Sequence, residues 1–307
     1  MNNWAYKNRY YIGGGIALAI VGIALYLSRK APKIVLDSIE ILKNPKVLVC
    51  SHITAVDSKL GTNAENSLKN ISVLINNDID IIEIDVQITK DGVPVLFHDN
   101  NLSPKTNASG SIPSMSWSQI QGVRYKSDSS QGIAKLSDAI DILKKSGKPI
   151  IFQLDKCDNN EIAKINSLGL FKGVEKQMLA KALSFQAPSS VRQSGIQYMP
   201  MLPTNYVGKM TSETVINEIA EKCKGAEFLE AQFSDKDTLI INGDLAKKLS
   251  QVGCRLFVVA VGGAQTTNAV SFRGDNQKQW EKMINPMGAG AIMTNKPLAL
   301  KNYINKK

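Results

Sequence analysis

Histidine is scarce in this chain, with only two residues among 307. Cysteine is also rare, and the four cysteines form no Cys-x-x-Cys pair or Cys/His zinc pattern. We interpret Cys50, Cys157, Cys223 and Cys254 as ordinary buried thiols, which leave the redox compartment open. Internal repeats and low-complexity tracts are missing as well. These absences disfavour a cysteine-based zinc domain and a repeat architecture.

Acidic residues are outnumbered, with 27 Asp and Glu against 37 Lys and Arg, which gives a net charge of +10 and a pI near 9.3. Such a surplus suits a polyanionic partner. However, the basic residues form no stripe interleaved with aromatics and no helix-turn-helix pattern is present, so we expect no nucleic-acid partner. An anionic lipid surface or a phosphate-bearing substrate explains the charge equally well.

The N-terminal region contains an uncharged apolar run over residues 10–27, YYIGGGIALAIVGIALYL. Its length is close to the ~20 residues that cross a hydrocarbon core. Tyrosines mark both ends as interfacial aromatics do, and basic residues flank both sides, so the charge rule leaves the orientation ambiguous. A cleaved signal peptide is the alternative, although the following SRKAPK has no clear cleavage site. Three consecutive glycines disfavour a buried core helix.

We therefore divide the chain into an anchor or signal segment at residues 1–33, a tether at 34–45 and one folded domain at 46–307. The anchor is expected to be a single transmembrane helix, with the folded domain on the extracytoplasmic side. At 43% hydrophobic residues, the chain is long and apolar enough for one large α/β domain or two small ones. The sequence does not indicate an oligomeric state.

Short β-branched runs alternate with amphipathic helical stretches in the rest of the chain, which is typical of βα units around a parallel sheet. The nine candidate strands are residues 46–51, 80–88, 93–99, 149–155, 175–182, 196–202, 226–233, 254–261 and 289–294. A (β/α)₈ TIM barrel needs eight strands. Because only the turn Lys90-Asp91-Gly92 joins the second and third, we expect one strand outside the barrel. The long, polar, Ser-rich loop at residues 100–132 is a candidate functional loop.

Both histidines lie at or just past the C-terminal end of a predicted strand: His52 follows KVLVCS and His98 closes VPVLF. Between them, Glu83 and Asp85 alternate on one strand and point the same way, about 7 Å apart at ~3.3 Å per residue. Strand ends of a parallel barrel open onto one face, where active sites of this fold are found. We therefore expect two imidazoles and two carboxylates to converge there.

Such a cluster supplies what phosphodiester cleavage needs, namely a base, an acid and a cation that neutralises phosphoryl charge. A single histidine more often has a structural role in a core or loop, with its hydrogen bonds satisfied, than a catalytic role. Here that structural explanation would have to hold for both His52 and His98. Glu83 and Asp85 would be solvated if their strand were exposed. Their apolar neighbours indicate instead a strand covered on both sides, where unpaired carboxylates are costly. Metal binding is the better explanation, because carboxylates suit a hard divalent cation.

The segments NAENSL and DIIEIDVQITKDGVPVLFHDNNL resemble the signature of the glycerophosphodiester phosphodiesterase family in order and spacing. Weaker similarity continues through IFQLDK, SFRGDNQKQWEKMI and GAGAIMTNKP, so the resemblance covers roughly residues 46–297. It implies a (β/α)₈ barrel with His52 and His98 as the acid/base pair. It also implies Glu83 and Asp85 as metal ligands, commonly for Ca²⁺ or Mg²⁺.

The next strand departs from the family pattern, because Gln153-Leu154-Asp155-Lys156 stands where a Glu-x-Lys is usual. Gln153 aligns with the glutamate, and only Asp155 offers a negative oxygen there. We favour Asp155 as the third ligand, reached through a one-residue bulge or directly, with Gln153 beside it. Lys156 would contact the substrate phosphate. Either Gln153 or Asp155 would otherwise be an ordinary polar residue at a strand end.

Other departures affect the positive charge of the site. The family's His-Arg-Gly reads His52-Ile53-Thr54 here, so the usual phosphate-contacting arginine is missing. The family's Pro-Glu-Asn reads AEN at residues 64–66, and Asn295 replaces the acid of its Thr-Asp-x-Pro motif. Lys156 and Lys181 are the nearest candidates to replace the arginine, although most lysines are simply solvated.

Our leading interpretation is a membrane-anchored, metal-dependent hydrolase of glycerophosphodiesters, with a small phosphodiester as its substrate. One alternative is an enzyme acting on intact phospholipids, like a phospholipase C or D. The other is a catalytically weakened barrel that serves as a membrane-tethered binding module, as the missing arginine and Gln153 suggest.

Overall fold

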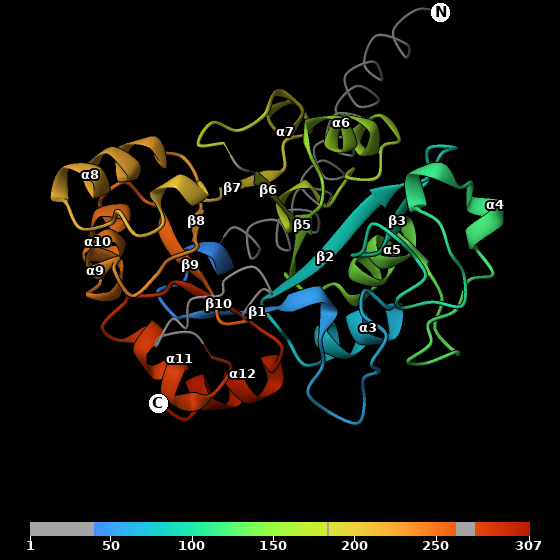
Figure 1. Cartoon of the computed structure of the whole chain (residues 1–307), viewed down its shortest axis with the longest axis horizontal. Helices are drawn as coiled ribbons and strands as arrows, with labels where there is room; N and C mark the ends of the chain where they lie inside the picture. Colours follow the sequence, from blue (N-terminus) through green and yellow to red (C-terminus); the bar gives the residue numbers. More distant parts are fainter. Residues whose placement is uncertain (1–39, 183, 262–273) are drawn as a thin grey trace, which may run out of the picture.

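The computed structural model of the 307-residue chain describes residues 40–182, 184–261 and 274–307. Its core is a nearly closed barrel of eight parallel strands, with the helices outside (Figure 1). The barrel strands are β1 (Leu48–Ser51), β2 (Ile81–Ile88), β5 (Ile151–Asp155), β6 (Met178–Ala182), β7 (Gln197–Pro200), β8 (Phe228–Ala231), β9 (Arg255–Val259) and β10 (Ala291–Thr294). The order around the barrel is β7-β6-β5-β2-β1-β10-β9-β8, and a parallel bridge between Met201 and Glu230 joins its two ends. The predicted (β/α)₈ barrel is confirmed.

Helices connect the strands on the outside of the barrel. They are α3 (Leu68–Asn76), α4 (Trp117–Ile120), α5 (Leu136–Ser146), α6 (Asn159–Ser167), α7 (Ser189–Ser194), α8 (Glu213–Lys222), α9 (Thr238–Ile241), α10 (Asp244–Gln251), α11 (Gln277–Ile284) and α12 (Pro297–Asn305). Short 3-10 turns are η1 (His52–Thr54), η2 (Ile112–Ser114), η3 (Glu175–Gln177) and η4 (Thr204–Tyr206). Local chemistry fixes the helix ends: Asp158 and Glu161 form a capping box at the start of α6, and Gly147 ends α5 with φ +61°.

The barrel interior is filled by side chains that alternate along the strands, as a period of two requires. An apolar layer closes its lower part, and its fully buried members include Leu48, Ile81, Ile151, Leu179, Met199, Phe228, Phe257 and Ala291. A larger apolar cluster packs the outward faces of the strands against the helices. β2 is therefore covered on both sides, which confirms the expectation from its continuous apolar run.

The strand expected outside the barrel is β3 (Pro94–Leu96). β3 pairs antiparallel with the C-terminal half of β2, where Val86 faces Leu96, and also with the short β4 (Ala134–Lys135). The turn before β3 needs Gly92, whose φ of +86° favours a residue without a Cβ. β2 thus projects beyond the barrel and carries a hairpin at the mouth.

The Ser-rich segment between β3 and β4 folds over its own small core. Leu102, Ile112, Ile120 and Tyr125 are buried in it and pack with Phe97. The Phe97 and Tyr125 ring centroids lie 6.1 Å apart. The segment is therefore a folded insertion beside the barrel mouth rather than a solvated loop.

The predicted anchor at residues 1–33 and most of the predicted tether lie outside the described residues. Residues 40–43 are helical, and Leu42 is buried against the apolar layer of the barrel. Throughout the described ranges, each helix is too short or too polar to cross a bilayer.

Candidate active site

A polar layer lies above the apolar layer inside the barrel. Each of its members stands two residues beyond an apolar interior residue on the same strand: Glu83 follows Ile81, Gln153 follows Ile151, Lys181 follows Leu179 and Glu230 follows Phe228. The two-residue alternation therefore aims all four side chains inward, toward the C-terminal ends of the strands.

Three carboxylates converge at the upper edge of this layer, where Asp85 and Asp155 follow Glu83 and Gln153 by two residues on β2 and β5. Oxygen atoms of Glu83, Asp85 and Asp155 all lie within 4.8 Å of one another. The β2–β5 ladder places Glu83 opposite Gln153 and Asp85 opposite Asp155 in regular parallel register. Asp155 thus reaches the cluster directly, without the bulge that we considered as one route.

Burial makes this cluster electrostatically unfavourable without a cation. Glu83 is 1% and Asp85 0% exposed. Burial, followed by the nearby carboxylates, raises the pKa of Glu83 well above its usual value. Burial and the charge of Asp155 raise the pKa of Asp85 to about 6. Burial is the largest single influence on Asp155 and acts to raise its pKa, but Lys181 and Lys156 together outweigh it, so the net pKa is lowered.

The donor set fits a hard divalent cation. Asp85 Oδ1 and both amide atoms of Gln153 are buried and have no hydrogen-bond partner among the described residues. Unpartnered buried oxygens are costly unless something binds them. Carboxylate and amide oxygens are the ligands that Ca²⁺ and Mg²⁺ prefer, so Glu83, Asp85, Asp155 and the Gln153 oxygen suit either ion.

Asn66 supports this cluster from the β1–α3 loop. Its Nδ2 donates to Asp85 Oδ2 at 2.8 Å, and its Oδ1 accepts from the Asp85 backbone N–H at 3.0 Å. Asn66 adopts φ +53°, a left-handed conformation that asparagine tolerates better than most residues. The sequence alone indicated no role for Asn66, although it lies in the AEN segment that resembles the family motif.

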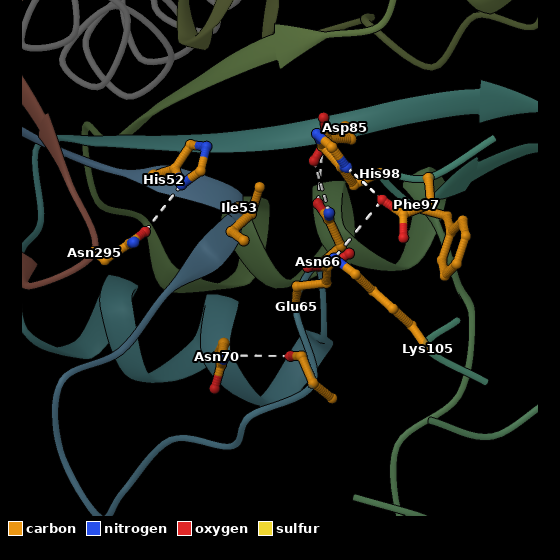
Figure 2. A network of polar contacts seen from close by, with 12 residues as sticks. His52, Ile53, Glu65, Asn66, Asn70, Asp85, Phe97, His98, Lys105 and Asn295 are labelled. Atoms are coloured by element: carbon orange, nitrogen blue, oxygen red, sulfur yellow. Dashed lines mark hydrogen bonds and ion pairs between the residues drawn. The ribbon is translucent and has the colours of Figure 1, made fainter. Parts of the chain in front are cut away.

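His52 begins η1, directly after β1. Its Nδ1 lies 2.9 Å from Asn295 Oδ1, at the end of β10 (Figure 2). An amide oxygen only accepts, so this contact places the proton on Nδ1 and leaves Nε2 with its lone pair. Burial lowers the pKa of His52, more than the Asn295 hydrogen bond raises it.

The two residues after His52 have unusual backbones. Ile53 and Thr54 have φ values of +45° and +56°, although a β-branched residue is a genuine outlier in this region. The turn directs the Ile53 N–H to a carboxylate oxygen of Glu83. Strain of this kind persists where surrounding structure holds it, and here it links the His52 turn to the acidic cluster.

His98 reaches the mouth by a different route from the one we predicted. β3 is antiparallel to β2, so its C-terminal end points back toward the barrel and does not open onto the common face of the parallel strands. The Phe97 N–H donates to the Asp85 carbonyl at 3.0 Å, which brings His98 beside β2. The His98 Nδ1 lies 2.7 Å from Asp99 Oδ1. His98 also contributes to lowering the pKa of His52, so the two rings lie within electrostatic reach.

Lys105, from the insertion, lies next to this histidine. Its ammonium bonds Glu65 and lies 3.8 Å from Asp99 Oδ1. Figure 2 shows Lys105, Glu65 and Asn66 on the His98 side of the mouth. Sequence reasoning missed Glu65, Asp99 and Lys105 because their association depends on the fold of the insertion.

The two lysines that we expected to replace the missing arginine occupy different environments. Lys156 is exposed at the mouth, directly after Asp155, with φ +60°. The Lys181 side chain is only 9% exposed, and its Nζ lies 2.6 Å from Asp155 Oδ2 and 3.6 Å from Glu230 Oε2. Glu230 was missed, although an acid two positions after Phe228 in a buried strand was a detectable signal.

Comparison with known proteins gives a consistent family match. The family model described as glycerophosphoryl diester phosphodiesterase family matches residues 58–258, which include His98 and the three carboxylates. A solved glycerophosphoryl diester phosphodiesterase from Parabacteroides distasonis superposes with a TM-score of 0.64 at 16% identity, covering 89% of this chain and 92% of that one. A phosphodiesterase from Oleispira antarctica, solved with the product sn-glycerol-3-phosphate, gives 0.59 at 17% identity, covering 85% and 97%.

Two curated relatives match over a short segment. A glycerophosphodiester phosphodiesterase of Arabidopsis thaliana is 40% identical over 62 residues, 18% of this chain and 17% of the relative. The human glycerophosphodiester phosphodiesterase 1 is 35% identical over 57 residues, 19% of this chain and 17% of the relative. The matched segment thus spans about a sixth of each curated relative.

Proposed function

This chain belongs to the glycerophosphoryl diester phosphodiesterase family, and from that membership we propose that it hydrolyses glycerophosphodiesters with a divalent cation bound at the barrel mouth. One observation carries the proposal: three carboxylates, two of them fully buried, have oxygen atoms within 4.8 Å of one another, and both histidines lie within electrostatic reach of this cluster. A phosphodiester needs charge neutralisation on its phosphoryl oxygens and proton transfer at two oxygens. The site offers groups for each task.

We assign the cation to Glu83, Asp85 and Asp155, with the Gln153 oxygen as a neutral fourth ligand. When bound, Ca²⁺ or Mg²⁺ would withdraw charge from the phosphoryl group. Lys156 is exposed at the same mouth and is available to a phosphate oxygen. Lys181 is committed to two carboxylates, which makes it a poorer direct ligand for substrate than we expected from the sequence.

We assign His52 as the general base. Burial favours the unprotonated ring near neutral pH, and it outweighs the hydrogen bond to Asn295, which acts to raise the pKa of His52. The contact of Nδ1 with the Asn295 oxygen leaves Nε2 as the acceptor. His52 Nε2 takes the proton of the attacking oxygen, which belongs either to water or to a hydroxyl of the substrate. Attack by a substrate hydroxyl gives a cyclic phosphate, which water then opens.

We assign His98 as the general acid. The Asp99 carboxylate holds the His98 ring through Nδ1, and an anionic partner complements the charge of an imidazolium. As the P–O bond to the alcohol breaks, His98 Nε2 gives its proton to the departing alkoxide. The products are a phosphate monoester and a free alcohol, so atoms and charge balance.

The test is hydrolysis of glycerophosphodiesters by the purified full chain with and without EDTA. We expect activity that EDTA abolishes and Mg²⁺ or Ca²⁺ restores. His52→Ala and His98→Ala should each lose about 10²–10⁴-fold in kcat, the usual contribution of a general acid or base. Turnover that survives EDTA, or survives loss of either histidine, would contradict the proposal.

Substrate choice separates this proposal from its two alternatives. Faster cleavage of intact phospholipid than of a soluble glycerophosphodiester would identify a phospholipase-like enzyme. Metal binding without cleavage of either substrate would identify a catalytically weakened binding module. Two departures from the family pattern favour the latter outcome, namely Ile53 in place of the usual arginine and Gln153 in place of the usual glutamate.

We also propose that residues 1–33 anchor the chain in a membrane and place the barrel on its extracytoplasmic side. The uncharged run and the tyrosines at its two ends support the membrane anchor, whereas the basic residues on both sides favour neither orientation. Resistance of the full chain to alkaline carbonate extraction, together with protease access to the barrel from the extracytoplasmic side, is the expected result. Release of the chain by carbonate would contradict the proposed membrane anchor.

A further inference from the structure

Glu230 and Lys181 are two buried charged residues beside the acidic cluster. Neither of them has a role in the proposed reaction. Glu230 is 3% exposed, and its Oε2 atom has no hydrogen-bond partner among the described residues. Burial raises the pKa of Glu230, although Lys181 opposes this. Apolar residues fill the barrel one step lower on the same two strands, so a buried ion pair here requires a separate explanation.

The Lys181 ammonium lies close to two carboxylates that come from different strands, β5 and β8. It bonds Asp155 Oδ2 at 2.6 Å, and Glu230 Oε2 lies slightly farther away at 3.6 Å. Asp155 is also one of the three residues whose oxygens converge as a candidate cation site. Lys181 therefore supplies positive charge to that cluster in the absence of a metal ion, and a second acceptor is free within a short movement of its flexible end.

A divalent cation and an ammonium repel each other strongly at a few ångströms in a partly buried site. Cation binding to Asp155 therefore disfavours the present position of Lys181. If Asp155 were the only anion near the Lys181 ammonium, that ammonium would hinder cation binding. The Glu230 carboxylate is a second anion, and its Oε2 atom lies where the displaced ammonium would need a partner.

We propose that Lys181 is the internal counter-cation of the metal-free acidic cluster and that Glu230 accepts its ammonium when a divalent cation binds Asp155. This inference rests on the metal site in the proposed function. It makes Glu230 a positioning residue for metal loading rather than a metal ligand or a catalytic residue. It also predicts that the two members of one ion pair affect metal affinity in opposite directions.

Calorimetric titration of the purified full chain with MgCl₂ and CaCl₂ tests the opposite signs, and it needs no substrate. Lys181→Met removes the competing charge and should tighten binding by about tenfold, whereas Glu230→Gln removes the alternative acceptor and should weaken it by about tenfold. Lys156→Met is the matched control, because Lys156 is an exposed lysine beside the same cluster. Screening by solvent should keep its effect below about threefold.

The double variant Lys181→Met/Glu230→Gln adds a check on coupling. With no ammonium to receive, the Glu230→Gln change should no longer weaken binding when introduced into Lys181→Met. Circular dichroism of each metal-free variant establishes that it is folded. If Lys181→Met does not fold, the Glu230→Gln titration alone decides, and unchanged affinity would overturn the proposal.

Two results distinguish failure of this inference from failure of the proposed function. If the wild-type chain binds metal and both single variants weaken binding, the pair is merely structural and the inference is wrong while the metal site stands. If the wild-type chain binds neither Mg²⁺ nor Ca²⁺, the proposed metal site falls and this inference falls with it.

Discussion

The two histidines differ in the group that holds Nδ1, and this difference assigns their proposed roles. A neutral amide holds His52, whereas a carboxylate holds His98. Neither partner was assigned from the sequence, although Asn295 was recognised as a departure from the family pattern. The contact between His52 and Asn295 joins residues that are far apart in the sequence, and it forms because β1 and β10 are neighbours in the closed barrel.

Asn295→Asp should shift the pH dependence of kcat/KM. The pKa of His52 is lowered in the folded protein, chiefly by burial, and a carboxylate at position 295 would raise it. Because a base must be unprotonated, the acidic limb of the profile should move to higher pH by about one unit, with little change on the alkaline side. Asn295→Ser, which keeps a neutral acceptor, is the control. An unmoved acidic limb for Asn295→Asp would reverse the assignment of His52 as base.

Asp85→Asn should stabilise the metal-free protein while abolishing metal binding. The folded-state pKa of Asp85 is raised to about 6 from 3.8, so ionisation of Asp85 costs stability as pH rises through that range. The cost is absent below about pH 4 and reaches about 3 kcal/mol by pH 7.5 at ~1.4 kcal/mol per pKa unit. In urea unfolding with EDTA present, the wild-type chain should therefore have a lower free energy of unfolding than Asp85→Asn at pH 7.5. This difference should disappear near pH 4.

Asp155→Asn is the control for that experiment because its expected sign is opposite. Lys181 holds the pKa of Asp155 below its usual value, so ionised Asp155 stabilises the fold at neutral pH. Its replacement should destabilise the metal-free protein at pH 7.5. Equal shifts for both variants would show that the removal of any carboxylate has the same effect.

At the scale of secondary-structure elements, the alternation of inward and outward side chains along a single strand was predictable from the sequence. The way in which the strands are arranged relative to one another was less predictable. The spacing of Glu83 and Asp85 on β2 correctly placed both inside the barrel, because a strand has a fixed period of two. One strand was correctly expected outside the barrel, but the antiparallel direction of β3 was not predicted, so the end of β3 was wrongly taken to open onto the common face with the barrel strands. The proximity of Lys181 to Glu230 was likewise not predictable, because it requires the closed barrel.

Phe97→Ala should destabilise the hairpin that positions His98. Phe97 is fully buried, packs on Tyr125 and directly precedes the histidine. Loss of its ring should cost about 3–5 kcal/mol in urea unfolding and reduce kcat under conditions where the barrel remains folded. Phe97→Leu, which keeps most of the volume, should lose less than about 1.5 kcal/mol. Full activity in a folded Phe97→Ala protein would show that the insertion core does not position His98.

At the scale of the whole molecule, the sequence predicted the barrel architecture better than it predicted the set of residues that would bind the cation. Apolar runs and helical spacing indicated nine strands, one of them outside an eight-stranded parallel barrel, and the order of the eight barrel strands confirms the barrel. Gln153 and Asp155 were placed on one strand face from the same reasoning, and their register opposite Glu83 and Asp85 supports it. The folded core of the insertion was not recognised, because its apolar residues are scattered among many serines.

Metal should stabilise the whole chain in proportion to its occupancy. A ligand that binds only the folded state adds about 2.7 kcal/mol at a hundred times its Kd. Thermal unfolding should therefore show a Tm that rises with MgCl₂ or CaCl₂ and falls on addition of EDTA. Asp85→Asn should lose this dependence, and a similar rise in that variant would point to nonspecific ion effects.

The antiparallel return of β3 separates the origins of the two histidines. His52 belongs to the barrel wall, whereas His98 is carried by an appended arm that packs on an insertion with its own core. Under the proposed role of His98 as general acid, substitutions in that arm would alter how the departing alcohol is accommodated without disturbing the eight-stranded scaffold. Divergence in headgroup preference among related chains should therefore accumulate in the arm more readily than in the wall.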